Sequence, residues 1–161
     1  MSYISFDKRQ LVNLEFAMNR EILRSNRLGA FYNTTIIGCN TRKYHGLLVV
    51  PQPQLDNNNH VLLSSIDETI IANKEEFHLG VHEYQDGTIM PRGHKYMREF
   101  TAVPIPKMRY RIGSSIFTKE LIFGEKESRV LLRYTLEEAL QPITLRLTPF
   151  LAFRNVHHGP P

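Results

Sequence analysis

The sequence has no tryptophan and a single cysteine, Cys39, in 161 residues. One thiol cannot form an internal disulfide, which is typical of proteins from a reducing compartment. No stretch approaches the roughly 20 apolar residues that a membrane-spanning helix needs, and residues 1–10 lack the apolar core of a signal peptide. We therefore expect a cytoplasmic protein with no membrane partner.

The chain also lacks a large excess of charge of one sign. The formal net charge is +4, and the basic residues are scattered, with no run of five or more. Such a pattern is typical of a solvated surface and argues against a nucleic-acid partner. With 42% hydrophobic and 22% charged residues, the composition predicts a folded globular chain, and its length suits one domain.

Alternation of apolar and polar residues dominates the second half of the chain. This period of two is the signature of strands with one buried face. Upstream segments also have strand character, and residues 86–96 are expected to form a long loop. The expected strands are 47–50, 61–64, 69–72, 75–82, 108–112, 115–123, 129–136 and 143–148. Short strands separated by turns predict an antiparallel sandwich or barrel.

Residues 8–24 are ambiguous. Leu11, Leu14, Met18 and Ile22 have helical spacing, whereas Leu14, Phe16 and Met18 fit a strand equally well. We favour a strand, because a turn-rich segment follows directly.

A short polar run lies between Gly38 and Gly46. Its Asn and Arg side chains supply planar hydrogen-bonding groups, and its Tyr has an apolar face with a polar tip. One interpretation is a sugar contact or a contact with another loop. The other is that Asn40 and Arg42 hold a buried turn together, and spacing alone favours this second interpretation.

The histidines do not predict a metal site. His78 and His82 are four residues apart, and on a strand they would be roughly 13 Å apart, too far to share one ion. No Cys or Asp cluster has zinc spacing. We expect no metal and, in the absence of a nucleotide-binding glycine motif, no cofactor.

Asp67 and Glu68 form an adjacent acidic pair with apolar neighbours. A glycosidase needs two carboxyl groups about 5–9.5 Å apart that face one substrate. Neighbouring residues on a strand point to opposite faces, so we expect one inward-bonded acid and one solvated acid. The sequence contains no self-contained catalytic constellation.

Two segments carry a resemblance to a known family. Residues 21–31 read EILRSNRLGAF, and residues 38–48 read GCNTRKYHGLL. Together they resemble the N-terminal domain of bacterial and archaeal glycogen debranching enzymes, and weaker matches extend over almost the whole chain. The sequence departs from the family pattern at Ser25 in place of Thr, at Arg27 and Ala30 in place of glycine, and at Asn155 in place of an acid.

The resemblance implies a large antiparallel β-sandwich, a supersandwich of the galactose-mutarotase-like kind, which would be truncated in this chain. Residues 1–161 would be the N-terminal domain of an amylo-α-1,6-glucosidase. The catalytic (α/α) barrel, which hydrolyses α-1,6-glucosidic branch points and carries the catalytic acid and base, would be absent. The implied partners are this C-terminal barrel and, through the full enzyme, an α-glucan such as glycogen.

By the same resemblance, a polar loop would lie at the interface with the barrel, near the glucan. Its candidate residues are Asn40, Arg42, Tyr44 and His45, with Asn26, Asp67 and Glu68 as weaker candidates. None of them is expected to cleave a bond. The alternatives are a stand-alone carbohydrate-binding module and a purely structural β-sandwich.

Overall fold

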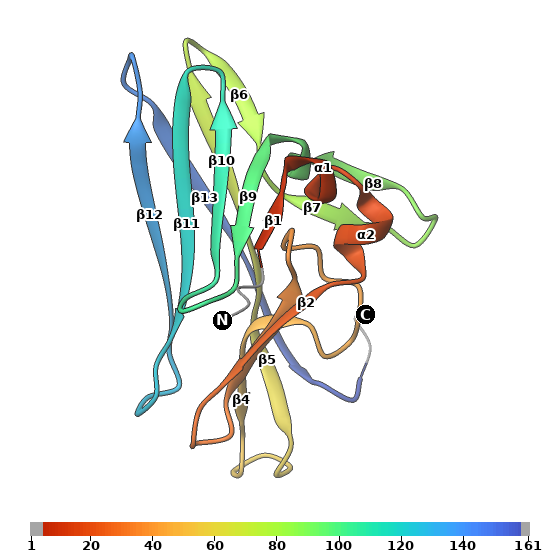
Figure 1. Ribbon diagram of the computed structural model, residues 1–161. Helices are drawn as coiled ribbons and strands as arrows, with labels where there is room; N and C mark the ends of the chain where they lie inside the picture. Colours follow the sequence, from red (N-terminus) through yellow and green to blue (C-terminus); the bar gives the residue numbers. More distant parts are fainter. Residues whose placement is uncertain (1–4, 159–161) are drawn as a thin grey trace.

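The computed structural model describes residues 5–158, which form two antiparallel sheets and a short hairpin (Figure 1). The first sheet has the order β1-β9-β10-β11-β12. These strands are Ser5–Asp7, Met97–Thr101, Lys107–Ile112, Ser115–Phe123 and Val130–Glu138. The second sheet has the order β13-β5-β4-β3-β2, with β6 also paired to β5. These strands are Thr144–Asn155, Asn59–Ala72, Gly46–Pro51, Phe31–Thr35, Glu21–Ser25 and Glu75–His78. The hairpin consists of β7, Val81–Glu83, and β8, Ile89–Arg92.

The main core lies between the two sheets. Alternate residues of β10 and β11 are buried, including Met108, Tyr110, Phe117 and Leu121. The hydroxyl of Tyr32 on β3 donates to the Leu121 carbonyl oxygen at 3.2 Å and so links the sheets. Burial of one face in each strand explains the period of two in the sequence. The expected all-β antiparallel sandwich is confirmed.

The N-terminal segment corrects one expectation. Residues 8–18 form two short helices, α1 (Lys8–Leu11) and α2 (Leu14–Met18), and the strand begins only at Glu21. Asp7 accepts from the Arg9 and Gln10 amides, while the Gln10 side chain accepts from the Asp7 amide. This reciprocal capping box satisfies amides that the first helical turn leaves unpaired.

The long central strand differs from expectation too. β5 runs without a break for 14 residues through both of the strands expected at 61–64 and 69–72. Conversely, the strand expected at 75–82 is interrupted between β6 and β7. Gly80 lies in that interruption, where a Cβ atom would be 2.6 Å from Oδ1 of Asp67. Only a glycine lets the chain approach the Asp67 carboxylate so closely.

The loop expected at 86–96 is more ordered than its sequence suggests. It contains β8 and a 3-10 helix, η1 (Gly93–Tyr96). A Cβ atom at Gly93 would lie 2.0 Å from the Leu79 carbonyl oxygen, so this segment packs directly on the backbone before β7. None of the helices within residues 5–158 is long and apolar enough to cross a membrane.

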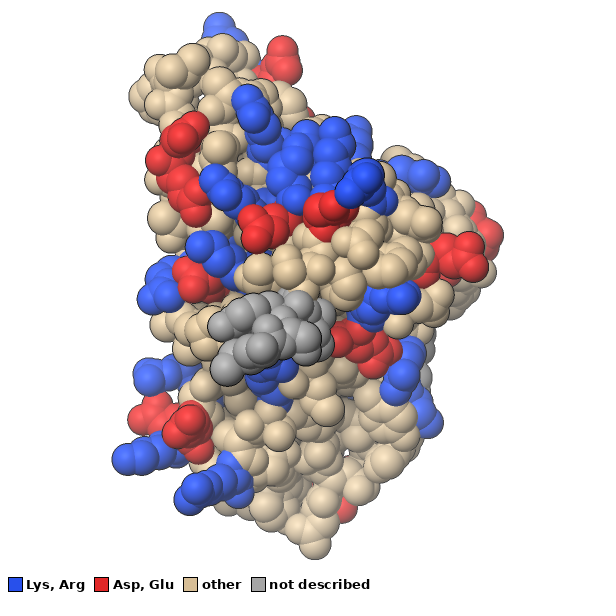
Figure 2. All heavy atoms as spheres, in the orientation of Figure 1, with Lys and Arg blue, Asp and Glu red and all other residues tan. Residues whose placement is uncertain are grey.

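Charged side chains of both signs are interspersed on the face shown in Figure 2. On the outer face of the first sheet, Arg109 lies 3.1 Å from Glu137, and Arg133 forms two hydrogen bonds with Glu120 at 2.9 and 3.0 Å. These pairs are exposed, and such pairs contribute little to stability. This outer face is therefore a solvated surface.

Candidate functional site

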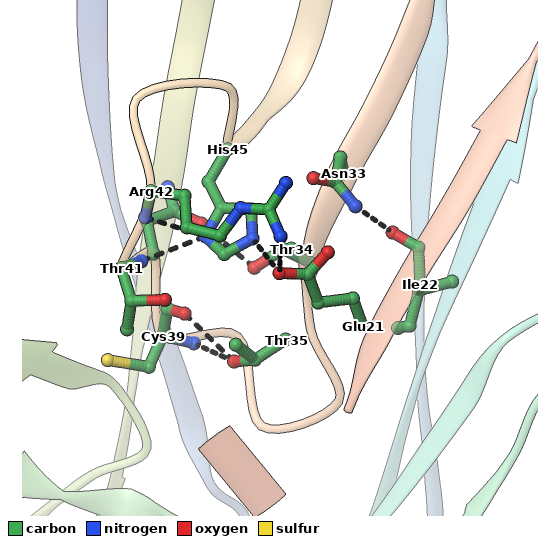
Figure 3. A network of polar contacts seen from close by, with 10 residues as sticks. Glu21, Ile22, Asn33, Thr34, Thr35, Cys39, Thr41, Arg42 and His45 are labelled. Atoms are coloured by element: carbon green, nitrogen blue, oxygen red, sulfur yellow. Dashed lines mark hydrogen bonds and ion pairs between the residues drawn. The ribbon is translucent and has the colours of Figure 1, made fainter. Parts of the chain in front are cut away.

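The polar run between Gly38 and Gly46 is a tight loop that connects β3 to β4 (Figure 3). His45 lies at its centre and has no exposed surface. Its Nδ1 accepts hydrogen bonds from the backbone amides of Thr41 at 2.8 Å and Arg42 at 3.1 Å. Because Nδ1 is an acceptor, the ring proton lies on Nε2.

Glu21 completes this arrangement from the start of β2. Its Oε1 accepts from Nε2 of His45 at 3.0 Å and lies 3.2 Å from the Arg42 guanidinium. Burial lowers the pKa of His45, although Glu21 opposes this shift. A neutral His45 is what two amide donors at Nδ1 require, so the loop geometry and the pKa direction agree.

The first half of the loop is held by different partners. Oδ1 of Asn40 accepts from the Thr34 hydroxyl, and its Nδ2 donates to the Ser64 carbonyl oxygen, both at 2.8 Å. Asn40 thereby ties the loop to β3 and β5. Together with Arg42 it holds the turn, which is the interpretation that spacing alone favours.

Cys39 is part of this support and not a reactive group. Its amide donates to the Thr35 hydroxyl at 2.8 Å, and the same hydroxyl donates to the Cys39 carbonyl oxygen at 2.9 Å. Burial raises the pKa of the thiol to about 11. A thiol with that pKa is protonated at neutral pH and a poor nucleophile.

Tyr44 points away from these groups. Its ring packs with the small apolar cluster of Val49, Val61 and Val156, and it makes an edge-on contact with His157 at 6.0 Å between ring centres. The structure therefore separates Tyr44 from the other three loop candidates and places it against the end of the described chain.

Asn26 also has a separate role. Its Oδ1 accepts from the Leu28 and Ala30 amides at 2.9 and 3.1 Å, and its Nδ2 donates to the carbonyl oxygens of Gly124 and Glu127. It therefore shapes the β2–β3 turn and fastens it to the β11–β12 turn. None of these partners belongs to segment 40–45.

Asp67 and Glu68 lie on opposite sides of β5, as strand alternation predicts. Both oxygens of Asp67 accept from Nε2 of His82, at 2.7 and 2.8 Å. Glu68 is buried between the sheets, where it pairs with Lys119 and accepts from the Tyr134 hydroxyl at 2.7 Å. The expectation of a freely solvated second acid is wrong, because Asp67 is half-buried and bonded to His82.

The sequence predicted one strand that carries both His78 and His82, but they lie on two strands, β6 and β7, and have different partners. His78 pairs with Thr69, with 3.1 Å between Nδ1 and Oγ1. Within residues 5–158, no group of three or more His, Cys, Asp or Glu side chains is placed to hold a metal ion.

An open hollow of about 900 Å³ adjoins the loop. Three segments form its walls: segment 40–45, residues 82–87 of β7 and the β7–β8 turn, and residues 150–154 of β13. Ser64 and Ser65 of β5 also line it. Asn40, Arg42 and His45 line this hollow, whereas Tyr44, Asn26, Asp67 and Glu68 do not. Its volume lies in the usual range for small-ligand sites.

The aromatic residues of this hollow were not among the residues predicted from the sequence. Tyr84, Phe150 and Phe153 line it, and their exposed fractions are 56%, 42% and 70%. Tyr84 immediately precedes the turn of a hairpin, where its amide donates to the Thr88 carbonyl oxygen at 2.8 Å. A large aromatic residue just before a Gln-Asp-Gly turn is the sequence feature that would have identified Tyr84 as a candidate.

Comparison with known proteins adds one finding. A family model described as the glycogen debranching enzyme N terminal matches residues 20–160. The corresponding comparisons with curated proteins and with solved structures returned no match.

Proposed function

This chain belongs to the family of glycogen debranching enzyme N-terminal domains, and from that premise we propose that it is the non-catalytic part of an enzyme that hydrolyses α-1,6-glucosidic branch points. It packs against the catalytic (α/α) barrel and helps to form the site for the α-glucan. The observation that carries this proposal is the hollow, because part of its wall is the loop on which the family resemblance rests.

The arrangement of carboxyl groups supports a non-catalytic role. Asp67 and Glu68 face opposite sides of β5 and are each engaged by other side chains. Glu83 is the one acid among the described residues that line the hollow. Hydrolysis of a glycosidic bond requires two carboxyl groups across one substrate, and the hollow does not supply such a pair.

The rigidity of the loop supports a role in binding. His45, Glu21 and Ser64 hold its backbone and its Asn40 side chain, while the Arg42 side chain remains 58% exposed. Polar groups that are held in place before a ligand arrives lose less entropy on binding. Loop residues 40–45 can therefore present hydrogen-bonding groups to a sugar or to the barrel.

The decisive experiment is an assay of the purified chain with glycogen, in which release of reducing sugar is measured. We expect no release above a blank without protein. Measurable debranching by the chain alone would overturn the non-catalytic role.

The exposed aromatic residues favour a second candidate, a stand-alone carbohydrate-binding module. Tyr84, Phe150 and Phe153 offer ring faces on which a sugar can stack, although the chain has no tryptophan. Calorimetric titration with maltooligosaccharides separates the candidates. The N-terminal role predicts weak or no binding by the isolated chain, whereas micromolar affinity would favour the module.

A further inference from the structure

We propose that the hollow is itself a binding subsite for a linear α-glucan segment, with Tyr84 and Phe150 as stacking surfaces and Asp67 as a positioning residue that acts through His82. This inference rests on the proposed function, whose site it specifies. It requires the isolated chain to bind glucan weakly at a defined place.

The first support is the position of the aromatic rings. Tyr84 and Phe150 come from different elements, the β7–β8 turn and β13, and both line the same hollow with exposed fractions of 56% and 42%. The apolar face of a glucosyl ring packs well on an aromatic side chain, whose entropic cost of immobilisation is small. Two separate rings on one hollow suit a chain of sugar units better than a single sugar.

The second support is that neighbouring side chains hold the Phe150 ring in place. The His82 ring packs against it at 5.5 Å between ring centres and an angle of 68°. His82 is held in turn by both oxygens of Asp67 at 2.7 and 2.8 Å. Gly80 allows this close approach of β7 to Asp67. The series from Asp67 through His82 to Phe150 fixes a stacking surface before any ligand binds.

The third support is that the basic groups around the hollow are already engaged. Arg42 pairs with Glu21 at 3.2 Å, and Arg154 donates to the carbonyl oxygens of Lys43 and His158, both at 3.0 Å. The Lys43 ammonium lies 5.1 Å from the centre of the Tyr44 ring. An anionic ligand would need convergent free cations, so this arrangement favours a neutral ligand.

Neutral hydrogen-bonding groups complete the lining. Ser65 lies opposite Phe150 in the β5–β13 register, and Thr41 and Gln85 belong to the other walls. Hydroxyl and amide groups both donate and accept, as the hydroxyl groups of a sugar do. Aromatic faces beside such groups match a neutral polyhydroxylated chain.

The test is an NMR titration of the isotope-labelled chain with maltoheptaose at millimolar concentration. We expect backbone amide signals from segments 40–45, 82–87 and 150–154 to shift. Phe150→Ala and Tyr84→Ala should each weaken binding by about tenfold, because each removes one stacking surface. Leu140→Ala is the matched control, since Leu140 is 89% exposed and lies outside the hollow, and it should leave the affinity unchanged.

The positioning role has its own pair of variants. Asp67→Ala should weaken maltoheptaose binding, whereas Asp67→Asn keeps an oxygen that accepts from His82 and should restore most of it. Equal affinity in wild type and Asp67→Ala would overturn the positioning role. If Asp67 had only a structural role, both variants would have a lower melting temperature but would not differ in their affinity for maltoheptaose.

Two results would overturn the subsite as a whole. One is the absence of shifts with millimolar maltoheptaose, which would make the hollow a surface for protein contact. The other is a set of shifts that map away from the three wall segments. Neither result touches the proposed function, which fails instead if the chain alone releases sugar from glycogen.

Discussion

Replacement of His45 by alanine should destabilise the chain strongly. His45 is fully buried and provides the acceptor for the Thr41 and Arg42 amides and the donor for Glu21. A buried polar group left without its partner costs about 1–3 kcal/mol, and two amides lose their acceptor here. Because water can reach the exposed loop around Arg42 and satisfy part of this loss, we expect a total of about 2–4 kcal/mol.

Urea unfolding followed by far-ultraviolet circular dichroism measures this loss, since the chain lacks the tryptophan that fluorescence would use. The midpoint should fall while the slope stays constant, and the melting temperature should drop by roughly 2–4 °C per kcal/mol. His158→Ala is the control, because His158 is exposed and contacts Arg154 through its carbonyl oxygen.

Two further substitutions separate the roles of the ring nitrogens. The side-chain oxygen of asparagine can take the place of Nδ1 and accept from the loop amides, so His45→Asn should recover more than half of the loss. Glutamine reaches toward Glu21 but does not serve the amides, so His45→Gln should recover less. If His45→Ala loses less than about 1 kcal/mol, or if glutamine rescues better than asparagine, the account of the loop is refuted.

Three other predictions concern buried groups. Lys119→Met should lower the free energy of unfolding in urea by about 3–5 kcal/mol, because it leaves Glu68 buried without its cation. The double variant with Glu68→Gln should recover part of this loss. A loss under about 1 kcal/mol for the single variant would contradict the prediction. Burial lowers the pKa of His45 and His94 below the ordinary 6.5, so near that pH the unfolded chain binds more protons than the folded chain. The free energy of unfolding should therefore be constant above about pH 6.5 and fall as the pH drops below it. A urea midpoint that rises when the pH is lowered from 7.5 to 5.5 would exclude this dependence. Cys39, fully buried with its pKa raised to about 11, should not react with a thiol reagent at pH 8 until urea unfolds the chain, and rapid labelling of the folded chain would show that the thiol is accessible.

Strand positions in the second half of the chain could be predicted because their signal is local. Segments 108–112 and 115–123 alternate in the sequence, and the structure places β10 and β11 there with one face of each in the core. Each such strand buries one face against the other sheet, so its pattern is readable without knowledge of its neighbours.

The N-terminal segment could not be assigned in the same way. α1 and α2 are too short for the 3.6-residue period to be distinguished from alternation. The deciding signal was the capping box between Asp7 and Gln10, not the apolar spacing. Similarly, Gly80 lies in the break between β6 and β7 and closely approaches Asp67 of β5, a contact that the sequence pattern does not show.

The all-β class and the family could be inferred from the amino-acid sequence, because strand alternation and the segments around Asn26 and Asn40 are local patterns. It also identified segment 40–45 as the polar loop of interest. The contacts of that loop follow from the three-dimensional arrangement of the strands. Glu21 and Ser64, which hold it, and Tyr84 and Phe150, which extend its hollow, are far from it in sequence. Hydrogen bonds and concave surfaces depend on distances in space, and strand pairing in the folded chain sets those distances.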